Sequence, residues 1–107
     1  MKWLTIDQII AALRLDAEQV ELERGLLELY GRSAERSVLN IVRRSHAELI
    51  ETYGEMPAEL VQASLLLVDR SYKERSPVEQ QQLGIASYSF DMLVRPYMKL
   101  DGEVNIL

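Results

Sequence analysis

The chain has 107 residues, of which 48% are apolar and 27% are charged, and it contains no cysteine. This composition predicts one globular domain over residues 1–107, and it excludes disulfide bonds, thiolate metal sites and a cysteine nucleophile. Seventeen acidic residues against twelve Lys and Arg give a formal net charge of −5, which disfavours a protein that binds DNA by neutralising its phosphates.

The first segment predicts a short helix over about residues 6–14. Thr5 is a candidate N-cap, and Gln8 follows at the capping-box spacing. Apolar residues then recur at helical spacing: Ile6, Ile9, Ile10 and Leu13. Polar and charged residues interrupt this stretch, so it is not a signal peptide. The aliphatic run at residues 65–68 is too short to cross a bilayer, and we expect a soluble, intracellular protein without a membrane partner.

A long amphipathic helix is predicted from Asp16 to about Arg44. Asp16 is a candidate N-cap with Gln19 at the third position after it. A stripe of residues at spacings of three, four or seven follows: Val20, Leu27, Tyr30, Ala34, Val38 and Ile41. Each of Gly25 and Gly31 costs about 1 kcal/mol relative to alanine, and a break near Gly31 is the alternative.

A short third helix is predicted over residues 45–53. Ser45 is its candidate N-cap, Glu48 occupies the capping-box position, and Gly54 stands where a helix commonly ends in a glycine. The only histidine of the chain, His46, lies in this segment. We interpret it as a partly exposed structural residue.

The next predicted helix, residues 58–74, is the most apolar element and starts after Pro57. Its apolar side chains cover most of its circumference, so it is buried on more than one side. In a chain this short, it is either the central core helix or a helix that a partner subunit also covers.

The C-terminal part is predicted as a flexible loop over residues 76–87 and a short last helix from Ser87 or Ser89. The loop includes a short extended piece at Leu83 to Ile85, and Pro96 limits the length of the helix. Residues 98–107 are expected to form a flexible tail. The predicted fold is therefore all-α, a compact bundle of about four to five helices with a long second helix.

No catalytic motif is present. The chain lacks the phosphate-binding loop, the dinucleotide fingerprint, the HExxH zinc motif and the GxSxG nucleophile motif. Glu48 with Glu51, or Asp69 with Glu74, could act as acid–base or metal pairs, but such spacings arise freely in a helical protein with seventeen acidic residues. We expect no enzymatic activity, no cofactor and no metal site.

Basic residues are mixed with acidic ones along the predicted helices. Arg32, Arg36, Arg43 and Arg44 alternate with residues such as Glu35, so no uniformly positive face is predicted. This mixing disfavours DNA recognition by a positive helix, and a small helical DNA-binding or regulatory protein is the alternative function.

Two regions together resemble the head–tail connector (adaptor) proteins of tailed bacteriophages, also known as phage DNA-packaging proteins. The first region is Leu4-Thr5-Ile6-Asp7 followed by Leu13-Arg14-Leu15-Asp16. The second begins with Tyr53-Gly54-Glu55-Met56-Pro57, continues through Gln62-Ala63-Ser64 and the aliphatic run to Val68, and closes with Leu93-Val94-Arg95-Pro96-Tyr97. These pieces occur in the order that the family shows and span nearly the whole chain.

The resemblance implies a structural role in the virion, with assembly in the host bacterial cytoplasm. Connector subunits form a ring of about twelve copies under the portal protein, and each ring contact joins two different faces of neighbouring subunits. The ring extends the DNA channel and contacts a head-completion or tail-completion protein. DNA passes through without specific binding, and carboxylates that line such a channel would repel its phosphates.

The resemblance also leads to two hypotheses about contact residues. The first is a subunit interface formed by Val61, Leu65, Leu66, Tyr72 and Arg75. The second is a docking surface for the portal or a neighbouring subunit, formed by Leu83, Ile85, Ile106 and Leu107.

Overall fold

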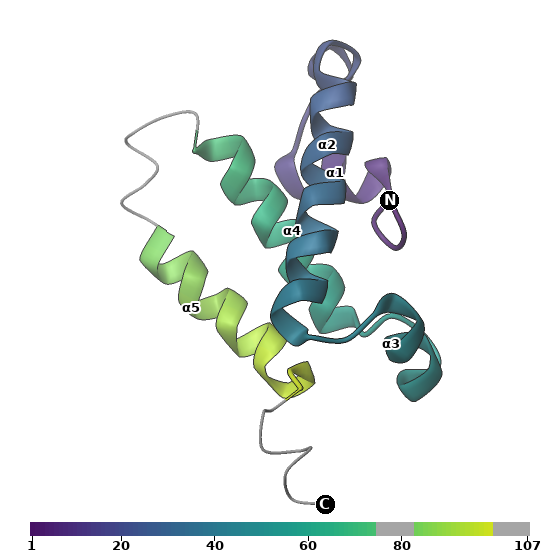
Figure 1. The fold of residues 1–107 in the computed structure, drawn as a ribbon. Coiled ribbons are helices and arrows are strands. Elements are labelled where there is room, and N and C mark those ends of the chain that lie inside the picture. The colour runs from purple at the N-terminus through teal and green to yellow at the C-terminus, as the bar shows by residue number, and fades with distance from the viewer. Residues whose placement is uncertain (75–82, 100–107) are drawn as a thin grey trace, which may run out of the picture.

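The computed structural model describes residues 1–74 and 83–99, and this part of the chain is all-α, as predicted (Figure 1). The helices in chain order are α1 (Ile6–Leu13), α2 (Ala17–Val42), α3 (His46–Tyr53), α4 (Ala58–Lys73) and α5 (Leu83–Val94). A 3₁₀ turn, η2 (Arg95–Tyr97), follows α5 directly. The molecule is elongated and flat, with principal extents of 54 × 30 × 17 Å.

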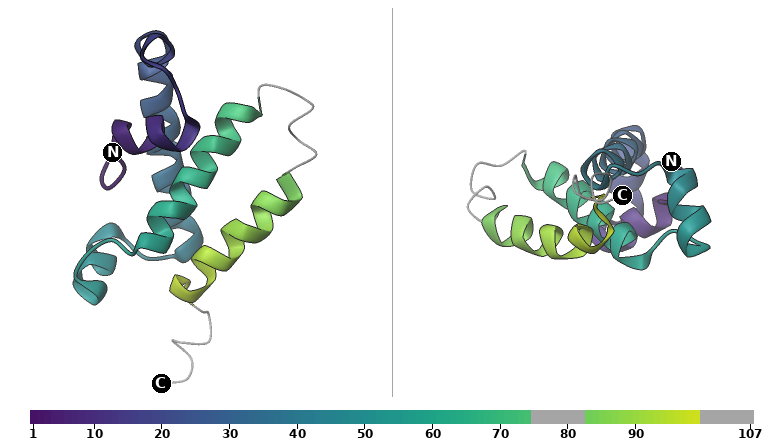
Figure 2. Two further views of the ribbon diagram at one scale, coloured as in Figure 1. Left: turned by 180° about the vertical axis from the view of Figure 1, so that it is seen from behind. Right: turned by 60° about the horizontal axis from the view of Figure 1, so that its bottom comes forward.

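Helix α4 is the centre of the fold. It contacts α1, α2 and α5, and the two views of Figure 2 show it between α2 and α5. Helix α3 projects sideways from the end of α2 that lies away from the α1–α2 corner. Helix α4 is therefore the central core helix, and its additional coverage by a partner subunit stays a prediction.

Side-chain caps begin the first three helices, as the sequence predicts. The Thr5 hydroxyl accepts a hydrogen bond from the Gln8 N–H at 3.1 Å, and the Gln8 side chain accepts one from the Thr5 N–H at 2.9 Å. Ser45 and Glu48 form the same reciprocal box at α3, and the Asp16 carboxylate accepts from the Gln19 N–H at 2.8 Å. These caps satisfy N–H groups that have no partner within a helix.

The same helices end at residues with left-handed backbone conformation. Gly54 closes α3 with φ 84°, which confirms its predicted position and suits a residue without a Cβ. Arg14 and Arg43 close α1 and α2 with φ of 55° and 60°. The tight corners between α1, α2 and α3 are therefore set at single residues.

Helix α2 runs for 26 residues without a break, so the alternative of two helices that meet near Gly31 is wrong. Gly31 is buried where the N-terminal segment and α1 cross α2. A Cβ at this position would collide with the Met1 sulfur and would lie 3.1 Å from Ile9 Cδ1. Close packing, rather than a helix break, explains this glycine.

Two hydrophobic clusters share α2 and α4. The first contains Val38, Val42, Leu49, Leu60, Ala63 and Val94, and the second contains Leu4, Ile9, Leu27, Ala34 and Val68. Trp3 and Leu67 are partly buried and pack against both clusters. The predicted stripe of α2 faces these clusters, and the fold depends on its contact with α4.

The prediction of a loop over residues 76–87 is wrong for its second half. Residues 83–87, including the expected extended piece at Leu83 to Ile85, belong to α5, and residues 76–82 lie outside the described part. Gly84 and the polar run before it weaken the local helical pattern, but α5 packs along α4, and such packing supplies most helical stability in proteins. Phe90 and Leu93 contact the first cluster, and α5 ends at Val94, just before η2 with Pro96.

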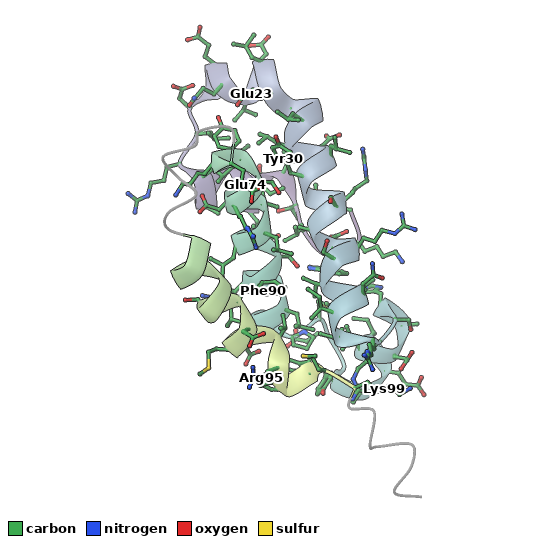
Figure 3. All side chains as sticks on the ribbon, turned by 60° about the vertical axis from the view of Figure 1, so that its left-hand side comes forward. Glu23, Tyr30, Glu74, Phe90, Arg95 and Lys99 are labelled. Carbon is green, nitrogen blue, oxygen red and sulfur yellow. The ribbon has the colours of Figure 1, made fainter. Side chains whose placement is uncertain are left out.

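The first two residues of the predicted tail, residues 98–107, contact the helical core. Met98 packs against the first cluster, and the Lys99 N–H donates to the Val42 carbonyl at 2.9 Å. Figure 3 shows Lys99 beside the end of α2, whose last carbonyls need such partners. Residues 100–107 lie outside the described part of the chain.

Tyr97 joins η2 to α3 and α4. Its hydroxyl donates to Glu59 Oε1 at 2.8 Å, and its ring meets Tyr53 edge to face at a centroid distance of 5.3 Å. Burial, followed by the bond to Glu59, raises the pKa of Tyr97 to about 12. A backbone hydrogen bond, followed by the Tyr97 hydroxyl, lowers the pKa of Glu59 below its ordinary value.

The glycines of α2 give a matched pair of substitutions. We expect Gly25→Ala to raise the free energy of unfolding by about 0.5–1 kcal/mol, since nothing lies within 4 Å of a Cβ there. Gly31→Ala should instead give no gain or a loss, because Met1 and Ile9 must move. Urea unfolding followed by circular dichroism measures both, and equal stabilisation by the two variants would contradict the packing at Gly31.

The pKa of Tyr97 predicts a loss of stability at alkaline pH. Because the folded-state pKa is about 12 and the ordinary value is 10.0, unfolding releases the proton of Tyr97 between these values, and stability falls as pH rises through this range. Tyr97→Phe should make this fall shallower. Urea unfolding at pH values from neutral to strongly alkaline tests it, and identical pH profiles for the two proteins would contradict it.

Candidate functional site

A single carboxylate holds the N-terminal segment against α2. Glu35 is only 5% exposed, and its two oxygens accept three backbone hydrogen bonds. The Lys2 N–H donates to Oε1 at 2.7 Å, and the N–H groups of Trp3 and Leu4 donate to Oε2, each at 2.8 Å. An ionised carboxylate is a strong acceptor, so it satisfies all three donors of a segment that has no helix or sheet of its own.

Sequence reasoning did not identify this role, because it considered Glu35 only as an acidic residue that alternates with arginines. The spacing of Glu35 from its apolar neighbours in the sequence nevertheless indicates that it faces the core. Glu35 lies four residues after Gly31 and three before Val38, and both of these residues are buried. A charged residue at this register faces inward and needs polar partners.

Trp3 ties the same segment to α3 and α4. Its indole N–H donates to the Ser64 hydroxyl at 3.1 Å, and Ser64 in turn donates to the Leu60 carbonyl at 2.8 Å. The Trp3 ring stacks on His46 with centroids 5.6 Å apart and planes 19° from parallel. His46 is thus a partly exposed structural residue, as predicted.

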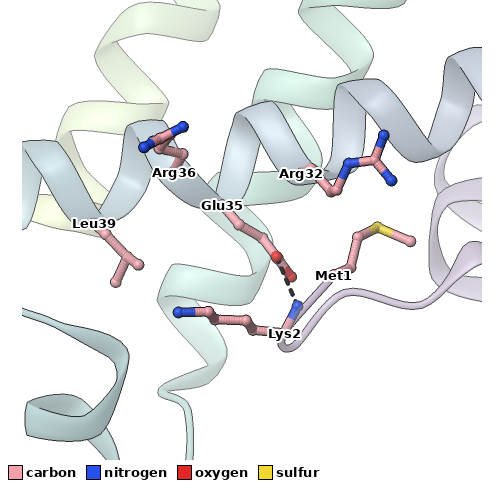
Figure 4. A pocket seen from close by; sticks show the side chains of 6 residues that line it. All are labelled: Met1, Lys2, Arg32, Glu35, Arg36 and Leu39. Atoms are coloured by element: carbon pink, nitrogen blue, oxygen red, sulfur yellow. Dashed lines mark hydrogen bonds between the residues drawn. The ribbon is translucent and has the colours of Figure 1, made fainter.

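A pocket of about 400 Å³ opens beside this segment, and Figure 4 shows its lining. It is lined by Met1, Lys2, Arg32, Glu35, Arg36 and Leu39. Within residues 1–74 and 83–99, the side chains of Lys2, Arg32 and Arg36 form no ion pair, and Glu35 accepts hydrogen bonds from backbone N–H groups instead of pairing with them. With three cationic side chains and one carboxylate in its lining, the pocket concentrates positive charge on an acidic protein.

Arg32 and Arg36 continue a row of exposed residues along α2. Leu22 is 78% exposed and Leu29 is 52% exposed, and both lie on the side of the helix opposite its buried residues. We call the row of Leu22, Leu29, Arg32 and Arg36 the α2 outer face. Sequence reasoning missed it, although two leucines seven residues apart outside the core stripe were its signal.

A second, apolar pocket of about 510 Å³ lies at the corner between α1 and α2. Its lining is Ile10, Leu15, Ala17, Val20, Glu21 and Arg24. It contains no candidate nucleophile with a base.

The predicted interface residues on α4 are half-buried. Val61, Leu65 and Tyr72 pack against the second cluster of their own chain, and the Tyr72 hydroxyl donates to Glu23 at 2.7 Å. Figure 3 shows that Glu23, Tyr30 and Glu74 lie at the same end of the molecule. Leu66 is also half-buried, and Arg75 lies outside the described residues. The interface role of these residues stays a prediction.

The structure describes the backbone of only two of the four other predicted contact residues. Leu83 and Ile85 fall in the first turn of α5, whereas Ile106 and Leu107 lie outside the described residues. Their docking role also stays a prediction.

Three of the four acidic residues considered as catalytic pairs have structural partners, and Glu51 is the exception among the described residues. Glu48 caps α3, Asp69 lies 3.3 Å from Lys73, and Glu74 lies 3.2 Å from Arg70. In the described part of the chain, no group of three or more potential ligands is arranged to hold a metal ion. None of the helices described here combines the length and the apolar character needed to span a membrane.

The role of Glu35 gives a stability prediction. Glu35→Gln keeps one acceptor oxygen but turns an amide N–H₂ toward backbone donors, so we expect the free energy of unfolding to fall by about 2–3 kcal/mol. Glu28→Gln is the control on the same helix, because Glu28 forms only a surface pair with Arg24 at 3.6 Å. Its effect should stay within about 0.5 kcal/mol. Equal effects in chemical denaturation would refute the special role of Glu35.

Comparison with known proteins identified no relative of this chain. No family model matches the chain, and no curated protein and no solved structure matches it.

Proposed function

We propose that the chain is a structural subunit of a head–tail connector of a tailed bacteriophage. In this role, copies of it form a ring adaptor between the portal and the tail or stopper, and the ring extends the DNA channel. The partners are other copies of the chain, the portal protein and a head-completion or tail-completion protein. DNA passes through the ring without specific binding.

The observation that carries the proposal is the α2 outer face. Large exposed apolar residues that share one helix face, flanked by arginines, are typical of protein–protein contact surfaces. Leu29 has this arrangement with Arg32 and Arg36, and Leu22 lies about two turns before it on the same face of α2. A ring subunit needs such a surface on every copy, because each copy contacts two neighbours.

The positions of the motifs that resemble the connector family support the same proposal. Leu4–Asp7 leads through the Thr5 cap into α1, and Leu13–Asp16 forms the corner before α2. The Tyr53–Pro57 motif links α3 to α4, and Leu93–Tyr97 joins the end of α5 to η2. Four of the motifs thus lie at helix boundaries and define the connections of the fold, and the run over residues 62–68 lies within α4.

A small helical DNA-binding or regulatory protein is the second candidate, and the pocket with Lys2, Arg32 and Arg36 favours it. Phosphate groups are ligands for such cations. The net charge of −5 opposes it, because the remaining surface repels DNA. This candidate predicts binding to duplex DNA that weakens steeply with salt, whereas a connector subunit should show little affinity.

Assembly of the purified chain tests the proposal. We expect sedimentation or mass photometry across a concentration series to show a discrete species whose mass is a multiple of 12.3 kDa, and negative-stain microscopy to show closed rings. The measurement is repeated with the cognate portal protein. A chain that stays monomeric under both conditions contradicts the proposal.

Leu22→Glu tests whether the α2 outer face takes part. Since Leu22 is almost fully exposed, the variant should keep the helical content and thermal stability of the wild type while its assembly weakens. Met92→Glu is the matched control, because Met92 is a 60% exposed apolar residue on α5. If both variants assemble as well as the wild type, the result would contradict a role of the α2 outer face in the interface.

A further inference from the structure

One part of the surface is the electrostatic opposite of the α2 outer face. The chain has no Lys or Arg between Arg44 and Arg70, and this stretch contains α3. At the end of α3, Ile50 and Tyr53 are exposed apolar residues and Glu51 and Glu55 are exposed carboxylates. We call these four residues the α3 tip.

The carboxylates of the α3 tip are available for a partner. Within residues 1–74 and 83–99, neither Glu51 nor Glu55 forms an ion pair. Glu48, by contrast, is used in the cap of α3. The tip therefore offers two negative charges beside two apolar side chains, and the α2 outer face offers two positive charges beside two leucines.

The two surfaces do not satisfy each other within one copy. Burial of Leu49 and the stacking of His46 on Trp3 fix the position of α3 on its own body. In this position Arg32, Arg36 and Lys2 remain without an acidic partner in the described residues. A second copy of the chain can therefore supply an α3 tip for the α2 outer face, and an α2 outer face for the α3 tip.

We propose that the α3 tip of one copy docks on the α2 outer face of the next copy, with Glu51 and Glu55 facing Lys2, Arg32 and Arg36. This inference rests on the proposed ring function and names its self-contact. Because the two surfaces differ, the contact is head-to-tail and leaves one free surface of each kind on a pair of copies. Further copies add at these free surfaces until the ring closes.

Apolar contact and charge have different parts in this interface. Exposed ion pairs contribute little individually, so burial of Leu29 against Ile50 and Tyr53 supplies affinity. The charges set the orientation and exclude the contact of two like surfaces. Association is accordingly expected to weaken as the salt concentration rises, because mobile ions screen exposed charges.

Charge reversal tests the proposal on the full chain. Arg32→Glu/Arg36→Glu and Glu51→Lys/Glu55→Lys should each weaken self-association by about tenfold or more, since like charges then face each other. An equal mixture of the two variants should assemble as well as the wild type, because every tip then meets a face of opposite charge. Arg24→Glu/Arg95→Glu is the charge-matched control, and it should assemble normally.

A cross-link gives a second readout that does not depend on affinity. The chain has no cysteine, so Arg36→Cys and Glu51→Cys introduce the only thiols. Mixed under mild oxidation, these two variants should form a disulfide-linked pair of chains, whereas Arg36→Cys with Arg95→Cys should not.

The outcomes separate this inference from the proposed function. Rings that survive both charge reversals and give no Arg36–Glu51 cross-link overturn the inference and leave the function in place. A closed dimer that shows the cross-link supports the inference and contradicts the ring. Absence of both self-association and cross-link at the highest soluble concentration overturns the inference. Duplex DNA binding that only Arg32→Glu/Arg36→Glu abolishes also overturns it.

Discussion

The position of the N-terminal segment, which packs against both hydrophobic clusters, depends on the carboxylate of Glu35. Its three bonds to successive N–H groups fix residues 2–4 against α2, and this position brings Trp3 to both hydrophobic clusters. Without it, three backbone donors would lie in a partly buried crossing with no acceptor, which costs about 1–3 kcal/mol for each.

The flat shape of the chain explains why surfaces remain available. Its smallest extent is 17 Å, so α2 and α3 each have one side against the core and one side toward solvent. A small domain also buries a modest share of its surface on folding. Association with further copies would bury apolar residues that the 107-residue chain cannot cover by itself.

Local signals predicted much of the fold, and long-range contacts account for what they missed. The caps at Thr5, Asp16 and Ser45 and the glycine at the end of α3 depend on neighbours within a few residues, so their sequence signals were reliable. The start of α5 depends on packing against α4. The role of Glu35 depends on residues more than thirty positions away, and the outer face of α2 appears only when the buried side is known. Local spacing indicates on which side of α2 these residues lie, but it does not identify the distant groups that contact them.

The hydrogen bonds between Glu35 and residues 2–4 have a consequence for how substitutions can change the charge of the pocket. Glu35 accepts its hydrogen bonds from backbone N–H groups, so any residue other than proline at position 2 supplies the same donor. The side chain at this position is therefore uncoupled from the fold although it lines the pocket. Replacement of Lys2 by a neutral or acidic residue would lower the positive charge of the pocket, while the helices, their caps and both clusters stay unchanged.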